Sequence, residues 1–112
     1  MVKKTIRSAK EADLLSKIRK AILLGNYQET EHAKQRAKER EIIGADSEYV
    51  LKTGSHETSK DKFDQIYNEW NYSIRGKTLD KRELRIIITF DEDGLLLITV
   101  IDLDLEENNE KN

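Results

Sequence analysis

The first third of the chain repeats apolar residues with the period of an α-helix. The apolar positions stand three or four residues apart: Leu14, Leu15, Ile18, Ala21 and Ile22. Ser8 precedes Glu11 by three residues, which is the spacing of a capping box at the amino end of a helix. Gly25 supplies a left-handed residue of the kind that ends many helices. We therefore predict an amphipathic helix over Ser8–Leu24.

A second helix is predicted over Glu31–Glu41, and it is unusually polar. Ala33 and Ala37 are its only positions suited to burial, and Gly44 is expected to end it. A helix with so few large apolar side chains needs close packing through its alanines, or a purpose for its polar face. A third, shorter helix is expected to begin at Asp46 or Ser47.

The carboxyl-terminal half changes to the period and composition of β-strands. Three strands are predicted, over 70–74, 84–90 and 95–101. The link Asp91–Gly94 ends in Asp-Gly, which indicates an antiparallel hairpin. Helices first and strands last favour an α+β fold. We expect amino-terminal helices packed on one face of a three- to four-stranded, mainly antiparallel sheet.

Length and composition fit one small domain. The chain has 112 residues, of which 37% are hydrophobic and 38% charged. We expect a single domain over 1–105 and a charged, disordered tail over 106–112. The absence of cysteine excludes a disulfide framework, a thiolate zinc site and a cysteine nucleophile.

The net charge of -2 conceals a gradient along the chain. Residues 1–40 carry 11 basic and 5 acidic side chains, and residues 41–85 carry 8 and 9. Residues 86–112 carry 1 basic and 8 acidic side chains. A basic first third attracts polyanions or acidic partner segments, although charged helices also simply solvate their outer faces.

Several classes of site and location find no support in the sequence. No stretch approaches the ~18 apolar residues that a membrane span requires, and the amino terminus has no apolar signal core. The two histidines, His32 and His56, are far apart and match no metal-ligand spacing, and no phosphate-binding glycine motif occurs. We therefore expect a cytoplasmic protein without metal, cofactor or membrane contact, and we expect His56 to be an ordinary surface residue.

The polar face of the second helix carries the most suggestive chemistry. His32, Arg36 and Arg40 stand four residues apart and so form a stripe on one face. A histidine can move protons near neutral pH, and arginines can hold phosphate oxygens or developing negative charge. Cleavage of a phosphodiester without a metal needs both abilities. The alternative is a solvated face whose arginines pair with nearby carboxylates.

The strands add candidates for holding a substrate. Basic residues fall on the first two strands and their connection, and aromatic residues alternate with them: Tyr72, Arg75, Lys77 and Arg85, with Trp70 beside them. Aromatic side chains interleaved with basic groups suit stacking on unpaired bases. Trp70 is more simply interpreted as a core or rim residue, and Tyr72 is open to either interpretation.

Three motifs together resemble a known family. They are His32-Ala33-x-x-Arg36-x-x-Glu39-Arg40, Tyr49-Val50-Leu51-x-x-Gly54 and Ile98-Thr99-Val100. The pattern resembles the family called domain of unknown function 4258 from about His32 to Leu103, and that family resembles the RelE/ParE-like and BrnT-type toxins of bacterial toxin–antitoxin systems. The resemblance implies a RelE-like fold, RNA as substrate and a small antitoxin protein as partner. It implies catalytic roles for His32, Arg36 and Arg40.

Two functions from different classes follow. The first is a toxin-like, metal-independent endoribonuclease in which Arg85, Lys77, Tyr72 and Arg75 bind RNA. The second is a non-catalytic interaction domain that binds an acidic protein, a nucleic acid or its own acidic tail. The stripe could also be only an ion-pair network that stabilises the fold.

Overall fold

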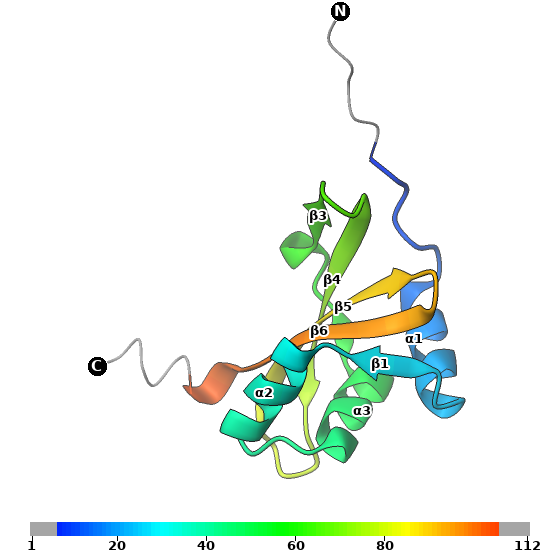
Figure 1. Cartoon of the computed structure of the whole chain (residues 1–112). Helices are drawn as coiled ribbons and strands as arrows, with labels where there is room; N and C mark the ends of the chain where they lie inside the picture. Colours follow the sequence, from blue (N-terminus) through cyan, green and yellow to red (C-terminus); the bar gives the residue numbers. More distant parts are fainter. Residues whose placement is uncertain (1–6, 106–112) are drawn as a thin grey trace, which may run out of the picture.

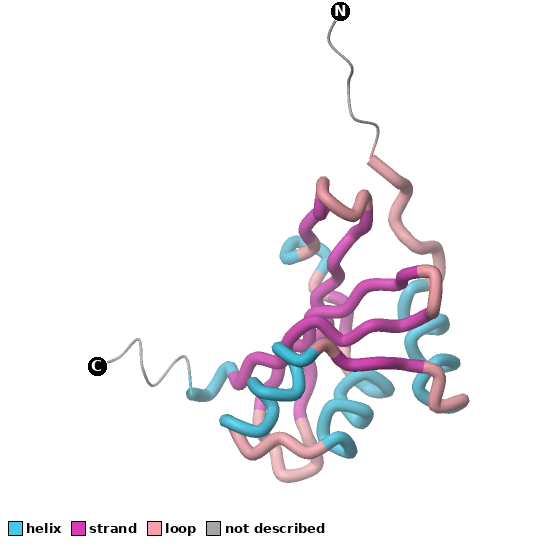
Figure 2. Tube along the Cα trace, viewed as in Figure 1, coloured by secondary structure: helices cyan, strands magenta, loops and turns pink. Residues whose placement is uncertain are grey.

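A computed structural model describes residues 7–105, which form one twisted sheet with helices packed against it (Figures 1 and 2). The helical elements are α1 (Leu14–Leu23), α2 (Glu31–Glu39), α3 (Gly44–Thr53) and the 3-10 turn η1 (Thr58–Lys60). The strands are β1 (Tyr27–Glu29), β2 (Ser55–His56), β3 (Lys62–Asp64), β4 (Glu69–Lys77), β5 (Glu83–Asp91) and β6 (Gly94–Asp102).

The sheet has six strands and mixed directions. Its order is β1-β6-β5-β4-β2, and β3 pairs with β4 outside this path. β1 runs parallel to β6, and every other pair is antiparallel. The α+β class is thus confirmed, but the predicted three to four strands are too few. The three missed strands have only two or three residues each, which is too short to show a period in the sequence.

Alternate residues of β4, β5 and β6 point to opposite sides of the sheet. Ile74, Ile86 and Val100 point to the side covered by α1 and α3, where they are buried in the core. We call the other side the open face, because α1 and α3 leave it uncovered (Figure 1). Its residues include Asn71, Ser73, Arg75, Arg85, Ile87, Thr89, Leu96 and Ile101.

The first helix begins at Leu14, six residues later than predicted. The Ser8 hydroxyl donates to the backbone carbonyl of Asn68, and the Trp70 indole N–H donates to the carbonyl of Ser8. Residues 7–13 therefore form a strap against the start of β4 rather than a first helical turn. Asp13, at a left-handed φ of 52°, separates the strap from α1. Tertiary hydrogen bonds have replaced the expected capping box.

The second helix matches its prediction, but its end does not. The Thr30 side chain accepts from the backbone N–H of Ala33 and caps α2, and Ala33 is fully buried where α2 packs against β6. Glu41, with a φ of 55°, ends this helical region. Gly44 begins α3 instead of ending α2.

The three predicted strands are confirmed within β4, β5 and β6, which extend further than predicted. The hairpin at Asp91–Gly94 is also confirmed, with Gly94 at a φ of 117°. An irregularity between Ile87 and Ile88 leaves Ile98 without a partner in the register. The predicted tail over 106–112 lies outside the described residues.

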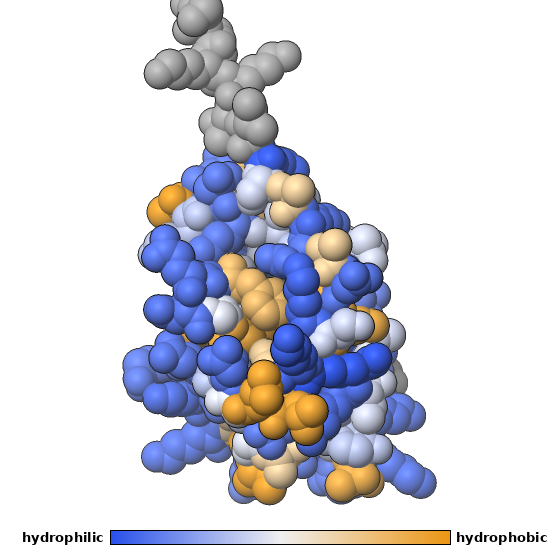
Figure 3. Space-filling view, turned by 90° about the vertical axis from the view of Figure 1, so that its right-hand side faces the viewer, coloured by the Kyte–Doolittle hydropathy of each residue, from blue (hydrophilic) through white to orange (hydrophobic). Residues whose placement is uncertain are grey.

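The face of the molecule on the side of α1 is predominantly hydrophilic. Figure 3 views the molecule from the side on which α1 lies and shows small apolar patches among charged side chains. Leu23 and Leu24, at the end of α1, are among the exposed large apolar residues. Exposed apolar residues in small groups like these need no special explanation. No helix within residues 7–105 is long and apolar enough to cross a membrane.

Candidate nucleic-acid interface on the open face

The predicted stripe on α2 is partly solvated and partly buried. His32 is exposed, and the Arg36 side chain, 44% exposed, donates to Glu39 at 3.1 Å. Arg40 is 23% exposed, and its buried Nε has no hydrogen-bond partner among the described residues. A buried donor without a partner is uncommon in folded proteins. The stripe therefore shows the expected ion pairing at Arg36, whereas the buried Nε of Arg40 has no ion pair or hydrogen bond among the described residues.

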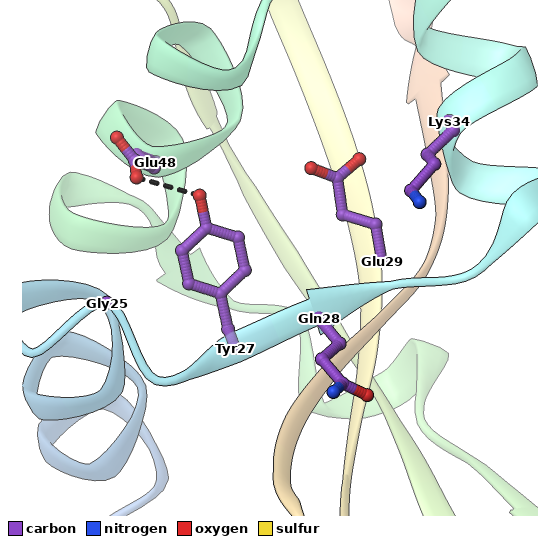
Figure 4. Close-up of a pocket in the computed structure, with 6 residues that line it drawn as sticks. All are labelled: Gly25, Tyr27, Gln28, Glu29, Lys34 and Glu48. Atoms are coloured by element: carbon purple, nitrogen blue, oxygen red, sulfur yellow. Dashed lines mark hydrogen bonds between the residues drawn. The ribbon is translucent and has the colours of Figure 1, made fainter.

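The position of Lys34 on α2 indicates the direction in which His32 and Arg36 point. Lys34 lines a hollow with Glu29 and Glu48, on the side of α2 toward α3 (Figure 4). His32 and Arg36 are each two residues from Lys34, which is about 200° around a helix. They therefore lie on the side of α2 that points away from α3.

The hollow beside Lys34 does not suit RNA. It has a volume of about 690 Å³, and Glu29 and Glu48 place two carboxylates on it (Figure 4). The Tyr27 hydroxyl donates to Glu48 at 2.7 Å. Burial, followed by this hydrogen bond, raises the pKa of Tyr27 to about 12, so the hydroxyl stays protonated at neutral pH. Two carboxylates against one ammonium repel a phosphate.

A second hollow, of about 310 Å³, lies on the open face. We call it the basic hollow, and its lining is Lys60, Lys62, Asn71, Arg85, Ile87 and Ile101. Lys60 comes from η1 and Lys62 from β3, which stand together beside β4 in Figure 1. Among the described residues, no carboxylate pairs with either lysine. The basic hollow thus places cations around an apolar floor formed by Ile87 and Ile101.

Glu57 organises the arginines at the edge of the basic hollow. Arg75 and Arg85 stand directly opposite each other on β4 and β5, where like charges would repel. Glu57 accepts from Arg85 Nε at 2.6 Å and from its second guanidinium nitrogen at 3.0 Å. Its carboxylate also lies 3.8 Å from Arg75 and accepts from the Ser73 hydroxyl. Glu57 therefore holds the Arg85 guanidinium by two hydrogen bonds and adds a longer ion pair to Arg75, whose Nε donates to Glu83 at 2.7 Å.

The same contacts fix the charge of Glu57. Hydrogen bonding from Arg85, aided by Ser73, lowers the pKa of Glu57 to about 2. A carboxylate this acidic stays ionised near neutral pH and is a poor proton acceptor or donor. Proton transfer at this face would require another residue, and His32 is the candidate from the sequence.

The opposite end of the open face is acidic. A hollow of about 440 Å³ is lined by Thr30, Asp64, Tyr67, Glu69, Asn71, Thr89, Asp91, Leu96 and Ile98. Burial, with the nearby charges of Asp91 and Asp64, raises the pKa of Glu69. Asn71 lines both hollows, so the face changes from acidic to basic along β4. From Glu69 to Arg75 this is about 20 Å of strand.

The structure separates the four predicted substrate-binding residues. Arg75 and Arg85 lie together on the open face, and Lys77 is exposed at the end of β4. Tyr72 points to the opposite side, is 3% exposed, and accepts from the backbone N–H of Glu11 at 2.7 Å. A side chain so buried cannot stack on a base. Tyr72 is therefore a core residue in this fold.

The sequence interpretation missed Lys60, Lys62 and Asn71. Residues 55–69 show no clear period, so the pairing of β3 with β4 could not be predicted. That pairing brings Lys62 opposite Asn71. The only available signal was the pair of lysines flanking Asp61.

His56 is tied into the structure rather than free on the surface. Its Nε2 lies 2.8 Å from the carboxylate of Asp61, whose side chain is 1% exposed. Asp61 also pairs with Lys10 of the strap at 3.0 Å and accepts from the backbone N–H of Ser73. This cluster joins the strap, β2 and β4. Within residues 7–105, no group of three or more acidic or histidine side chains is arranged to hold a metal ion.

The comparisons identify the family but no closer relative. The family model described as Domain of unknown function (DUF4258) matches residues 30–102, so the chain belongs to this family. The matched region runs from the cap of α2 to the end of β6 and contains the stripe and every lining residue of both open-face hollows. No curated protein and no solved structure matches the chain.

Tyr72→Phe tests the assignment of Tyr72 to the core. Removing the hydroxyl leaves the Glu11 N–H without its acceptor, so we expect the free energy of unfolding to fall by about 1 kcal/mol. Chemical denaturation measures this change. We expect RNA affinity to stay the same. A large loss of affinity in a folded variant would contradict the core assignment and would indicate that Tyr72 contacts RNA.

Proposed function

We propose that this protein is a toxin-type endoribonuclease that holds single-stranded RNA on the basic end of its open face. The observation that carries the proposal is the basic hollow, where Lys60 and Lys62 stand beside Arg85 over an apolar floor. Cations suit the phosphate backbone, and the apolar floor suits a base or ribose. A hollow of about 310 Å³ is large enough for about one nucleotide.

The proposed reaction is cleavage by the neighbouring 2′-hydroxyl of the RNA. The 2′-oxygen attacks phosphorus, the bond to the 5′-oxygen breaks, and a proton moves from the first oxygen to the second. His32 would accept or return this proton, because Glu57 is held ionised. Arg36 and Arg40, whose side chains are 44% and 23% exposed, would stabilise the charge on phosphorus.

The cellular setting follows from the same proposal. A toxin of this class would act on RNA in the bacterial cytoplasm and would be held inactive by an antitoxin protein. The acidic end of the open face favours a partner that carries basic side chains there, next to the Tyr67 ring and Leu96.

A non-catalytic interaction domain is the second candidate. The acidic hollow favours it, because phosphate would be repelled from that half of the open face. RNA would then be bound at the basic end without being cleaved. The two candidates share the binding surface and differ in the role of His32.

Charge removal at the basic hollow tests RNA binding. We expect Lys60→Gln/Lys62→Gln to weaken binding of a single-stranded RNA oligonucleotide about tenfold. The slope of log affinity against log salt concentration should also fall by the equivalent of about two phosphate contacts. Fluorescence anisotropy over a salt series measures both. The control is Lys20→Gln/Lys52→Gln, which removes the same charge from exposed positions outside the hollow. An equal loss in both variants would contradict a defined site.

Cleavage is tested separately at the stripe. We expect the unmodified protein to arrest growth and to cut RNA in the presence of EDTA, and Arg36→Ala to abolish both effects. Because the Arg36 side chain is 44% exposed and its ion pair with Glu39 lies on the surface, the variant should fold normally, which circular dichroism checks. RNA that stays equally intact with both proteins would refute the nuclease and leave the RNA-binding domain.

A further inference from the structure

The end of β6 directs the chain to the basic end of the open face. Asp102 is 4% exposed, and its carboxylate accepts from the backbone N–H groups of Asp104 and Leu105 at 3.0 and 3.2 Å. The Asp104 carboxylate accepts from the backbone N–H of Glu83 at 3.1 Å. Glu83 begins β5 two residues before Arg85. The described chain therefore ends beside the basic hollow.

The residues that follow have the charge that the basic hollow lacks. Residues 106–112, which lie outside the described part of the chain, contain Glu106, Glu107, Glu110 and a single lysine. Lys60 and Lys62 have no carboxylate partner within residues 7–105, and Ile101, five residues before Glu106, lines the same hollow. The three glutamates thus follow Ile101 by five to nine residues, and Ile101 lines the same hollow as the two lysines.

The distances allow direct contact. An extended chain covers about 3.3 Å per residue, so residues 106–110 reach on the order of 16 Å. From β6 across β5 and β4 to β3, which carries Lys62, is three strand spacings, or about 14 Å. The acidic half of the face would repel the same glutamates, which leaves the basic hollow as the complementary surface.

We propose that Glu106, Glu107 and Glu110 dock on the basic hollow and compete there with RNA. The competition rests on the proposed function, whereas the docking does not. The segment lowers the affinity of the protein for RNA. A partner that draws the segment away, or neutralises it, activates binding.

Zero-length carbodiimide cross-linking tests the docking without RNA. Treatment of the full chain, followed by peptide mass spectrometry, is expected to join these glutamates mainly to Lys60 and Lys62. Lys77 and Lys81 are the internal controls, since both are exposed at the same end of the sheet, Lys77 as the last residue of β4 and Lys81 in the link to β5. Cross-links spread equally over all four lysines, or none to Lys60 and Lys62, would overturn the docking.

RNA binding tests the competition against a variant of equal charge. Three surface ion pairs are worth about 1.4 kcal/mol together, so Glu106→Gln/Glu107→Gln/Glu110→Gln should bind RNA about tenfold more tightly. The control is Asp13→Asn/Glu29→Gln/Glu41→Gln, which changes the net charge equally at residues that line neither open-face hollow. An equal gain in the control would show that only net charge matters and would overturn the competition.

The two proposals can fail separately. If the selective cross-links form but neither the wild-type chain nor the glutamine variant binds RNA, the docking stands and the proposed function fails. If the wild-type chain and both variants bind RNA equally and the cross-links are unselective, the proposed function stands and the docking fails.

Discussion

Gly54→Ala is expected to lower the free energy of unfolding by about 3 kcal/mol, the upper range for overpacking. A Cβ at Gly54 would lie 2.6 Å from the backbone oxygens of both Arg75 and Val50. Backbone atoms cannot move aside as a side-chain end can. The substitution would therefore push the end of α3 away from β4, at the strand that carries Arg75. Thermal and urea denaturation measure the loss.

Gly44→Ala is the matched control. No atom lies within 4 Å of a Cβ at Gly44, which is the first residue of α3. Alanine favours the helix over glycine by up to about 1 kcal/mol, so we expect unchanged or increased stability. Equal destabilisation by both substitutions would mean that the close contact at Gly54 is not the cause.

Glu57→Gln is expected to cost about 2 kcal/mol at neutral pH, after a discount for partial solvent screening. The change removes the charge between Arg75 and Arg85 and leaves two guanidinium groups opposite each other. Glu83→Gln is the control, because within residues 7–105 Glu83 forms an ion pair only with Arg75, whose side chain is 41% exposed. That exposed pair should contribute less than about 1 kcal/mol.

The pH dependence distinguishes an ion pair from simple packing. The pKa of Glu57 is about 2 in the folded chain against an ordinary value of 4.5, so the unfolded chain binds the proton more tightly. The stabilisation is therefore complete above pH 4.5 and is lost as the pH falls toward 2. We expect the stability of the wild-type and Glu57→Gln proteins to converge over this range. Curves that stay parallel would contradict the ion-pair account.

The same ion pair links stability to the proposed binding surface. Glu57 fixes the direction of Arg85 and remains charged, so the arginine is positioned before RNA arrives. Preorganised donors cost less free energy to use than mobile ones. In Glu57→Gln, we therefore expect the change in RNA affinity to reflect both a gain in net positive charge and a loss of order at Arg85.

Local patterns in the sequence determined the elements with a long, regular period. The alanines of α2, the paired strands β5 and β6 and their Asp-Gly link follow from spacing and turn chemistry alone. The stripe of His32, Arg36 and Arg40 is likewise a property of helical spacing. These features depend on residues within about one element of each other, so no tertiary contact was needed to predict them.

Tertiary structure alone decided the position of the first helix and the composition of the site. Ser8 had the spacing of a cap, but its hydroxyl donates to Asn68, 60 residues away, and the helix begins at Leu14. Strand pairing placed Lys62 beside Asn71, put Arg75 opposite Arg85, and turned Tyr72 into the core. A shift of one residue in register would reverse every one of these assignments. Register depends on contacts between residues far apart in the chain, and no local pattern contains that information.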